Sequence, residues 1–172
     1  MKGDMKMQKF GIIIPGQPAT KKNSGRIIRV GNFPRIVPSA AYMKYEKHVR
    51  EQINLLRYQH KIPHYTMPVN LCCRYWLQSY AHWPDLMGLL QATADIISDE
   101  MKIIGGRKTV ACQWLLADDC IVRSTDGSQI MGVDKYNPRA EVVVTPLEVN
   151  PETECIPFVR KQIKQRQAQS LF

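Results

Sequence analysis

The chain has 172 residues, 44% of them hydrophobic, and a formal net charge of +9. This length can bury the core of one domain, and no run of eighteen apolar residues is present that could span a membrane. The first residues include lysines but no long apolar stretch of the kind found in signal peptides. The five cysteines form no CxxC pair and no Cys/His metal spacing, which is typical of reduced thiols. We therefore expect a single-domain cytoplasmic protein without a membrane span.

The positive charge is concentrated in the first third of the chain. Residues 1–61 contain 13 Lys and Arg against three acids, a balance of +10, whereas residues 62–172 balance to −1. A basic surface of this size suits a polyanion, because each neutralised phosphate releases counterions. A basic protein whose lysines are merely solvated has the same composition, so charge alone leaves both interpretations open.

The N-terminal half predicts a strand, an irregular segment and a helix. Residues 1–9 are polar and we expect them to be flexible, while the apolar run at 10–16 closes with Pro and Gly and predicts a strand. Residues 17–39 are rich in Pro, Gly, Asn and basic side chains, which favours a long loop or an irregular hairpin. Ser39 can cap a helix over 40–58. Its apolar residues recur at helical spacing: Tyr42, Tyr45, Val49, Ile53 and Leu56.

Alternation and helical periodicity predict the next two elements. Residues 67–80 predict a strand, and residues 88–103 follow a helical period. The apolar side of that strand would consist of Val69, Leu71, Cys73, Tyr75 and Leu77. The segment "IGGRKT" breaks the chain, and residues 110–124 predict one strand or two short ones around Asp118 and Asp119.

The C-terminal part predicts a loop, a last strand and a tail. A loop passes through Gly127, Gly132 and Pro138, and residues 140–148 predict a strand. The resulting order predicts a small single-domain α/β (α+β) fold with a mixed β-sheet and two main helices. We expect the domain to cover residues 10–148, followed by a basic tail at 149–172.

Two acidic positions could form a metal site. A hard cation such as Mg²⁺ prefers oxygen ligands, and converging carboxylates could hold it for phosphodiester cleavage. Asp85 lies between a predicted strand and a predicted helix, and Asp118 and Asp119 lie in a later strand. Because neighbouring residues of a strand face opposite sides, only one of that pair could join Asp85. The alternative is structural: Asp85 caps its helix, and Asp118 and Asp119 form an exposed turn.

Five segments in order resemble the RusA family of Holliday junction resolvases over about residues 10–148. That family typically has G-x-P-x-x-K-N, then D-L-D-N-x-x-K with a further Asp in the same helix, then D-D-x-Q-V and a basic residue before a last strand. The matching segments are "GIIIPGQPATKKN", a Tyr-rich basic helix, "PDLMGLLQATADII", "ADDCIV" and "NPRAEVVV".

The resemblance implies a homodimeric endonuclease that binds four-way DNA junctions and nicks two strands symmetrically with Mg²⁺, for which Mn²⁺ can substitute. It places the family's first D-L-D acid on Asp85 and the acids of D-D on Asp118 and Asp119. The catalytic residues would then be Asp85, Asp119 and Asp118, with Asp85 and Asp119 as metal ligands. A two-fold axis would present two such sites to a pseudo-symmetric junction.

Four positions depart from the family's motifs. The second acid of D-L-D falls on Met87, whose soft thioether is a poor ligand for a hard cation. The motif's Asn falls on Gly88, its Lys on Gln91, and the Gln of D-D-x-Q-V on Ile121. These departures favour a second hypothesis, a catalytically impaired relative that binds branched DNA or a protein partner without cutting.

Basic residues near the predicted first helix are the candidates for DNA contact. The loop residues sit in the Gly/Pro-rich segment, and three more lie on the polar face of the helix. The DNA-binding residues we predict are Lys21, Lys22, Asn23, Arg26, Lys44, Lys47 and Arg50. A third hypothesis is a basic interaction protein unrelated to DNA, which an exposed apolar patch in place of a basic groove would mark.

Overall fold

The computed structural model of the chain describes residues 8–21, 25–60, 62–81 and 83–148. Most of the predicted flexible N-terminus (1–9) and the whole predicted basic tail (149–172) lie outside this part. Neither helix within it combines the length and the apolar character that a membrane span requires.

A five-stranded mixed sheet forms the base of the molecule. Its strands run in the order β1–β9–β4–β7, and β8 also pairs with β4. β9 is antiparallel to both β1 and β4, whereas β7 and β8 are parallel to β4. The strands are β1 (Phe10–Pro15), β4 (Val69–Leu77), β7 (Val122–Ser124), β8 (Gln129–Val133) and β9 (Arg139–Pro146).

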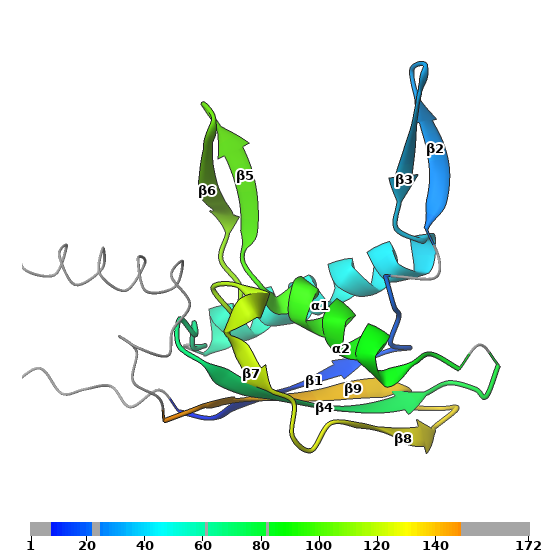
Figure 1. The fold of residues 1–172 in the computed structure, drawn as a ribbon. Helices are drawn as coiled ribbons and strands as arrows, with labels where there is room; N and C mark the ends of the chain where they lie inside the picture. Colours follow the sequence, from blue (N-terminus) through cyan, green and yellow to red (C-terminus); the bar gives the residue numbers. More distant parts are fainter. Residues whose placement is uncertain (1–7, 22–24, 61, 82, 149–172) are drawn as a thin grey trace, which may run out of the picture.

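Two helices cover one face of this sheet, α1 (Ala40–Gln59) and α2 (Leu86–Ile97) (Figure 1). The core lies between the helices and the sheet. All five predicted apolar positions of β4 are buried, and so are four of the five predicted positions of α1. The structure therefore confirms the mixed α+β fold, the central strand and the packing face of α1.

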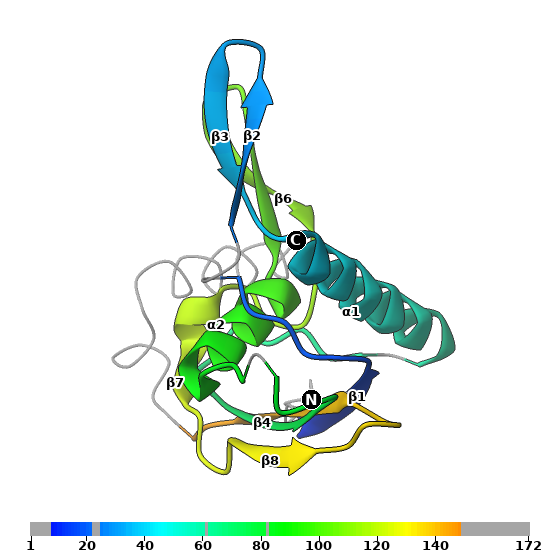
Figure 2. The ribbon, with the colours of Figure 1, turned by 90° about the vertical axis from the view of Figure 1, so that its right-hand side faces the viewer.

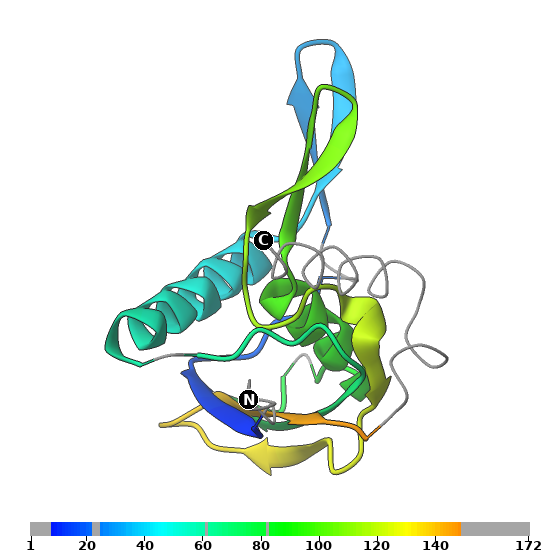
Figure 3. The same ribbon diagram turned by 90° about the vertical axis from the view of Figure 1, so that its left-hand side faces the viewer.

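Two hairpins stand away from the body on the helix side of the sheet. One joins β2 (Arg26–Val30) to β3 (Phe33–Val37), and the other joins β5 (Glu100–Ile104) to β6 (Arg107–Cys112). Figure 1 shows the two hairpins apart from each other, and Figures 2 and 3 show both projecting in the same direction. We call these hairpins arm 1 and arm 2.

The first helix begins as its sequence predicts. The side chain of Ser39 accepts a hydrogen bond from the Tyr42 N–H at 3.1 Å, which satisfies one of the free donors of the first turn. The irregular segment before it is in part an ordered hairpin, arm 1. Its turn is tight because Gly31 adopts a left-handed backbone (φ 62°) that suits glycine.

The second helix is shorter than its period predicts, and the predicted helix over 88–103 was wrong at its end. α2 stops at Ile97 because the N–H groups of Leu115 and Leu116 donate to the Ile97 carbonyl at 2.9 and 3.0 Å. Residues 100–104 then form β5, which pairs with β6. The break at "IGGRKT" is the turn of arm 2.

The region from 113 to 138 also differs from the prediction. Residues 113–118 belong to no strand, although 114–117 are buried, and Asp119–Ile121 form a 3₁₀ turn (η1) before β7. The predicted loop after residue 124 contains β8, which pairs with β4. β8 has no alternating apolar pattern. Its presence could not be predicted from the sequence, because it forms by pairing with the distant strand β4.

Candidate functional site

A cavity of about 280 Å³ brings together side chains from both helices, η1 and the segment before arm 1. Four of the nine residues that line it are aspartates, and two are basic. The lining residues are Lys21, Tyr42, Glu46, Arg50, Asp95, Ser98, Asp99, Asp118 and Asp119. We call this the acid cavity.

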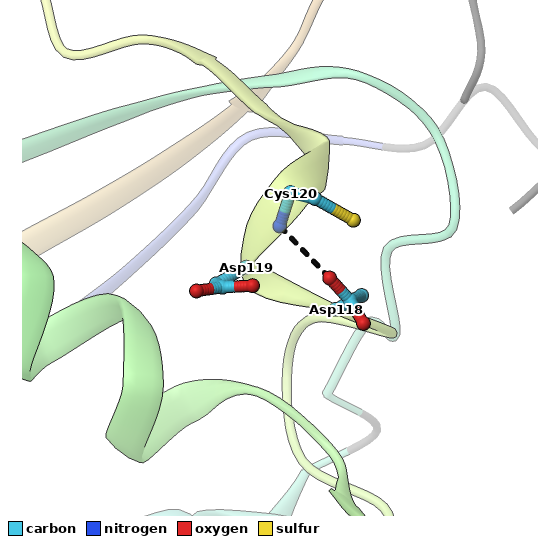
Figure 4. Close-up of side chains that lie close together, drawn as sticks. All are labelled: Asp118, Asp119 and Cys120. Atoms are coloured by element: carbon cyan, nitrogen blue, oxygen red, sulfur yellow. Dashed lines mark hydrogen bonds between the residues drawn. The ribbon is translucent and has the colours of Figure 1, made fainter. Parts of the chain in front are cut away.

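Asp118 and Asp119 lie close together because of the 3₁₀ turn. Asp118 caps η1, and its Oδ1 accepts a hydrogen bond from the Cys120 N–H at 3.0 Å. One ligand atom each from Asp118, Asp119 and Cys120 lies within 4.8 Å of the others. Figure 4 shows the Asp119 carboxylate directed toward the neighbouring helix. The prediction that adjacent acids would face opposite sides was wrong, because they are not on a strand.

The two carboxyl groups influence each other's ionisation. Burial raises the pKa of Asp119, and its hydrogen bond to Asp118 and the charges of Asp118 and Asp95 raise it further. Burial also acts to raise the pKa of Asp118, but hydrogen bonds to Cys120 and Asp119 and the charge of Lys108 outweigh it and lower the pKa. These surroundings thus favour the protonated form of Asp119 and the carboxylate form of Asp118.

Asp95, in the last turns of α2, faces the same cavity. Its carboxylate is 3.2 Å from the Nζ of Lys21, with the two side chains 23% and 54% exposed. Asp95 and Asp119 line the same cavity, and the charge of Asp95 contributes to the raised pKa of Asp119. Asp95 lies in the segment "PDLMGLLQATADII" that resembles the family's helix, and the structure makes it part of the cavity wall.

Asp85 lies at the other end of α2. It caps the helix, accepting a hydrogen bond from the Gly88 N–H at 2.6 Å, and it does not line the acid cavity. Ten residues of helix separate it from Asp95, a rise of about 15 Å. A Cβ on Gly88 would meet an Asp85 carboxylate oxygen at 2.8 Å, so glycine leaves room for this cap.

Two of the positions that depart from the family's motifs also lie outside the acid cavity. Met87 is 70% exposed on the first turn of α2, and Gln91 is also exposed. Neither lines the acid cavity. The structure thus brings together Asp118 and Asp119, adds Asp95, and places Asp85 at a distance.

The predicted DNA-binding residues fall into three groups. Lys22 and Asn23 lie outside the described residues. Arg26, Lys44 and Lys47 are exposed, although Lys47 is 3.8 Å from Glu51.

Lys21 and Arg50 instead line the acid cavity. Arg50 is held by Glu46 at 3.0 Å and Glu100 at 3.4 Å, and its guanidinium lies 5.2 Å from the centre of the Trp114 ring. Its role in the structure is to join α1, β5 and the segment after β6.

Sequence reasoning missed Asp99, a buried carboxylate in the cavity wall. Asp99 accepts a hydrogen bond from the Trp114 N–H at 2.7 Å and lies 3.0 Å from the Nε2 of His64. It therefore fixes the start of the segment that leads to Asp118. Asp99 lies inside the helix that the sequence predicts over 88–103, where it would be an ordinary helical acid, and its partners are too distant in the chain to predict.

Comparison with known proteins adds no relative: no family model matches the chain, and no curated protein matches it significantly. The resemblance to the RusA family therefore depends on the motifs alone.

Proposed function

We propose that the protein is a metal-dependent endonuclease that acts on branched DNA, with four-way junctions as its substrate. The observation that carries this proposal is the convergence of Asp95, Asp118 and Asp119 in one cavity beside a lysine. The ordered motifs that resemble the RusA family give the proposal its substrate. The basic first third of the chain supports a polyanionic partner.

The residues of the cavity fit a hard divalent cation. Asp118 and Asp119 would hold Mg²⁺ or Mn²⁺ through carboxylate oxygens, with Asp95 as the third acid. Cys120 lies beside these two acids, but its soft sulfur is a poor ligand for a hard cation such as Mg²⁺. When bound, such a cation would provide an activated water and stabilise negative charge on the phosphate.

Of the two basic residues of the cavity, Lys21 would position the phosphate. Lys21 is half-exposed, and its long side chain can exchange the carboxylate of Asp95 for a phosphate oxygen of the substrate. That exchange would free Asp95 to face the cation. Arg50 stays with Glu46 and Glu100 and keeps the wall in place.

A second candidate function is binding of branched DNA without cutting. The observation that favours it is the Lys21–Asp95 ion pair, which neutralises the third acid without any cation. The departures at Met87 and Gln91 point in the same direction, because the family's acid and lysine are absent there.

One experiment separates the two functions. The purified protein is incubated with a labelled four-way junction and with linear duplex, in EDTA, Mg²⁺ or Mn²⁺. The proposed nuclease binds the junction in EDTA and cuts it only with metal, faster with Mn²⁺, which tolerates less regular geometry. Binding without any product under all three conditions would establish the binder, and no binding would refute both.

The proposal extends to assembly and location. Symmetric resolution requires two active sites, so we propose a homodimer. Free thiols at Cys72, Cys73, Cys112 and Cys120 are compatible with a reducing compartment, and we propose the cytoplasm.

A further inference from the structure

The two arms carry apolar side chains that the rest of the described structure leaves uncovered. No residue of β2, β3, β5 or β6 is buried. Phe33 is 74% exposed and Ile36 79% on arm 1, and Ile103 is 72% exposed on arm 2. Exposed apolar residues concentrated on a projecting element mark an interaction surface.

The charge on the arms identifies the kind of partner. Arm 1 carries three arginines and no acid, and arm 2 carries three basic residues and one acid. That acid, Glu100, lies at the base of arm 2, 3.4 Å from Arg50. Beyond its base, each arm therefore carries basic side chains and no acidic ones. The basic residues are Arg26, Arg29, Arg35, Lys102, Arg107 and Lys108.

Both arms begin at the acid cavity. Lys21, which lines the cavity, lies five residues before arm 1, and Tyr42, also in the wall, lies five residues after it. Arm 2 starts directly after Ser98 and Asp99, two more residues of the wall. A partner held between the arms would therefore reach the cavity.

We propose that the arms bind DNA as two β-ribbons, with their basic residues on phosphates and the apolar residues near their tips against the bases. Strands of five residues extend about 17 Å, which exceeds the roughly 8.5 Å depth of the major groove that admits such ribbons. Apolar side chains such as Phe and Ile act as wedges between bases in several DNA-bending proteins. The inference rests on the proposed function, since it specifies how that DNA is held.

The same charges argue against the second possible occupant, another copy of the chain. Arm-to-arm packing of two copies would bring six basic residues of one copy against six of the other without acids to offset them. A nucleic acid has the complementary charge, so DNA is the partner that the arms favour.

The test compares three double variants and one single variant in EDTA. Arg29→Ala/Arg35→Ala removes two charges from arm 1, and Lys102→Ala/Arg107→Ala removes two from arm 2. The matched control, Lys9→Ala/Arg74→Ala, removes two charges around a separate pocket on the sheet. Phe33→Ala removes the aromatic ring near the tip of arm 1. Circular dichroism and thermal melts verify folding, which these exposed positions should not disturb.

Junction affinity is measured at several salt concentrations. Each arm double variant should weaken binding roughly tenfold and lower the slope of log K against log salt by about 2, one per lost phosphate contact. Phe33→Ala should weaken binding at least about fivefold with an unchanged slope, since stacking on a base is not ionic. It should also reduce the fluorescence change of 2-aminopurine placed at the branch point. The control should match wild type.

The outcomes separate this inference from the proposed function. If wild type binds no DNA, both are refuted. If wild type binds but the arm variants bind like the control, the inference alone is overturned. It is also overturned if Phe33→Ala converts a dimer to a monomer by light scattering while junction affinity stays constant, because the arms would then be a self-association surface.

Discussion

At the scale of single residues, the acid cavity depends on the 3₁₀ turn η1, which the sequence pair Asp118–Asp119 did not predict. Asp118 and Asp119 point to the same region because η1 replaces the expected strand. Asp95 lines the same cavity from the opposite end of the helix that Asp85 caps. The acids at the positions that resemble the family's motifs thus divide into one set at the cavity and Asp85 at the N-terminus of α2.

The separation of Asp85 from the acid cavity predicts which carboxylates contribute to metal affinity. Asp119→Asn should weaken Mn²⁺ binding by more than roughly tenfold, because the loss of even an outer-shell partner costs about tenfold or more. Asp95→Asn should weaken it less in the absence of DNA, because Lys21 holds the Asp95 carboxylate at 3.2 Å. Asp85→Asn should leave it unchanged, because Asn caps helices as well as Asp. Met87→Asp should not raise it, since that residue lies beside Asp85. Titration calorimetry without DNA measures all four variants. An equal loss in Asp85→Asn would place the metal at the other end of α2.

Thiol reactivity offers a second test of the cavity's electrostatics. Cys112 and Cys120 are both exposed, but partial burial, a hydrogen bond to Asp118 and the charges of Asp118 and Asp119 raise the pKa of Cys120 to about 12. Only the thiolate reacts, so iodoacetamide at pH 8 should modify Cys112 first and Cys120 much more slowly. Asp118→Asn should accelerate Cys120. Mass spectrometry of tryptic peptides follows both sites over time, and equal rates in the wild type would contradict this account.

At the scale of elements, the sequence predicted the helices and strands whose formation depends on neighbouring residues in the chain. Ser39 and the spacing of Tyr42 and Val49 predicted α1, and the alternation in residues 69–77 predicted β4. The end of α2 was not predictable, because Leu115 and Leu116 occupy its last carbonyl from far along the chain. The acid cavity was predictable only in part: Asp118 and Asp119 were found, but the contribution of Asp95 depends on how α2 packs.

The segment between β6 and η1 should be the most sensitive part of this arrangement. Asp99→Ala would leave the Trp114 N–H without its 2.7 Å acceptor and remove the partner of His64. The loss of such buried contacts costs about 3 kcal/mol of unfolding free energy. Urea denaturation measures the difference. Glu51→Ala, which removes an exposed partner of Lys47, serves as control and should change stability by less than about 0.5 kcal/mol.

At the scale of the whole molecule, the proposed DNA-binding surface and the proposed catalytic site lie in different places: on the arms and in the acid cavity. The arms are exposed and basic, while the acids line a cavity formed by residues of α1, α2, η1 and the segments that lead into the arms. One subunit offers one acid cavity within the described residues, yet resolution of a four-way junction needs two opposed nicks. The proposed nuclease must therefore act as a pair of subunits around a two-fold axis.

Paired action predicts how the products change when one site is inactive. Light scattering should give about twice the 19.8 kDa chain mass. A supercoiled plasmid with an extruded cruciform should become linear with wild-type protein, because two coordinated nicks fall on opposed strands. Heterodimers of wild type and Asp119→Asn, isolated through two different affinity tags, should yield nicked circles, because only one subunit can cut. Linear product from such heterodimers at the wild-type rate would mean that one subunit makes both nicks, and the paired model would fail.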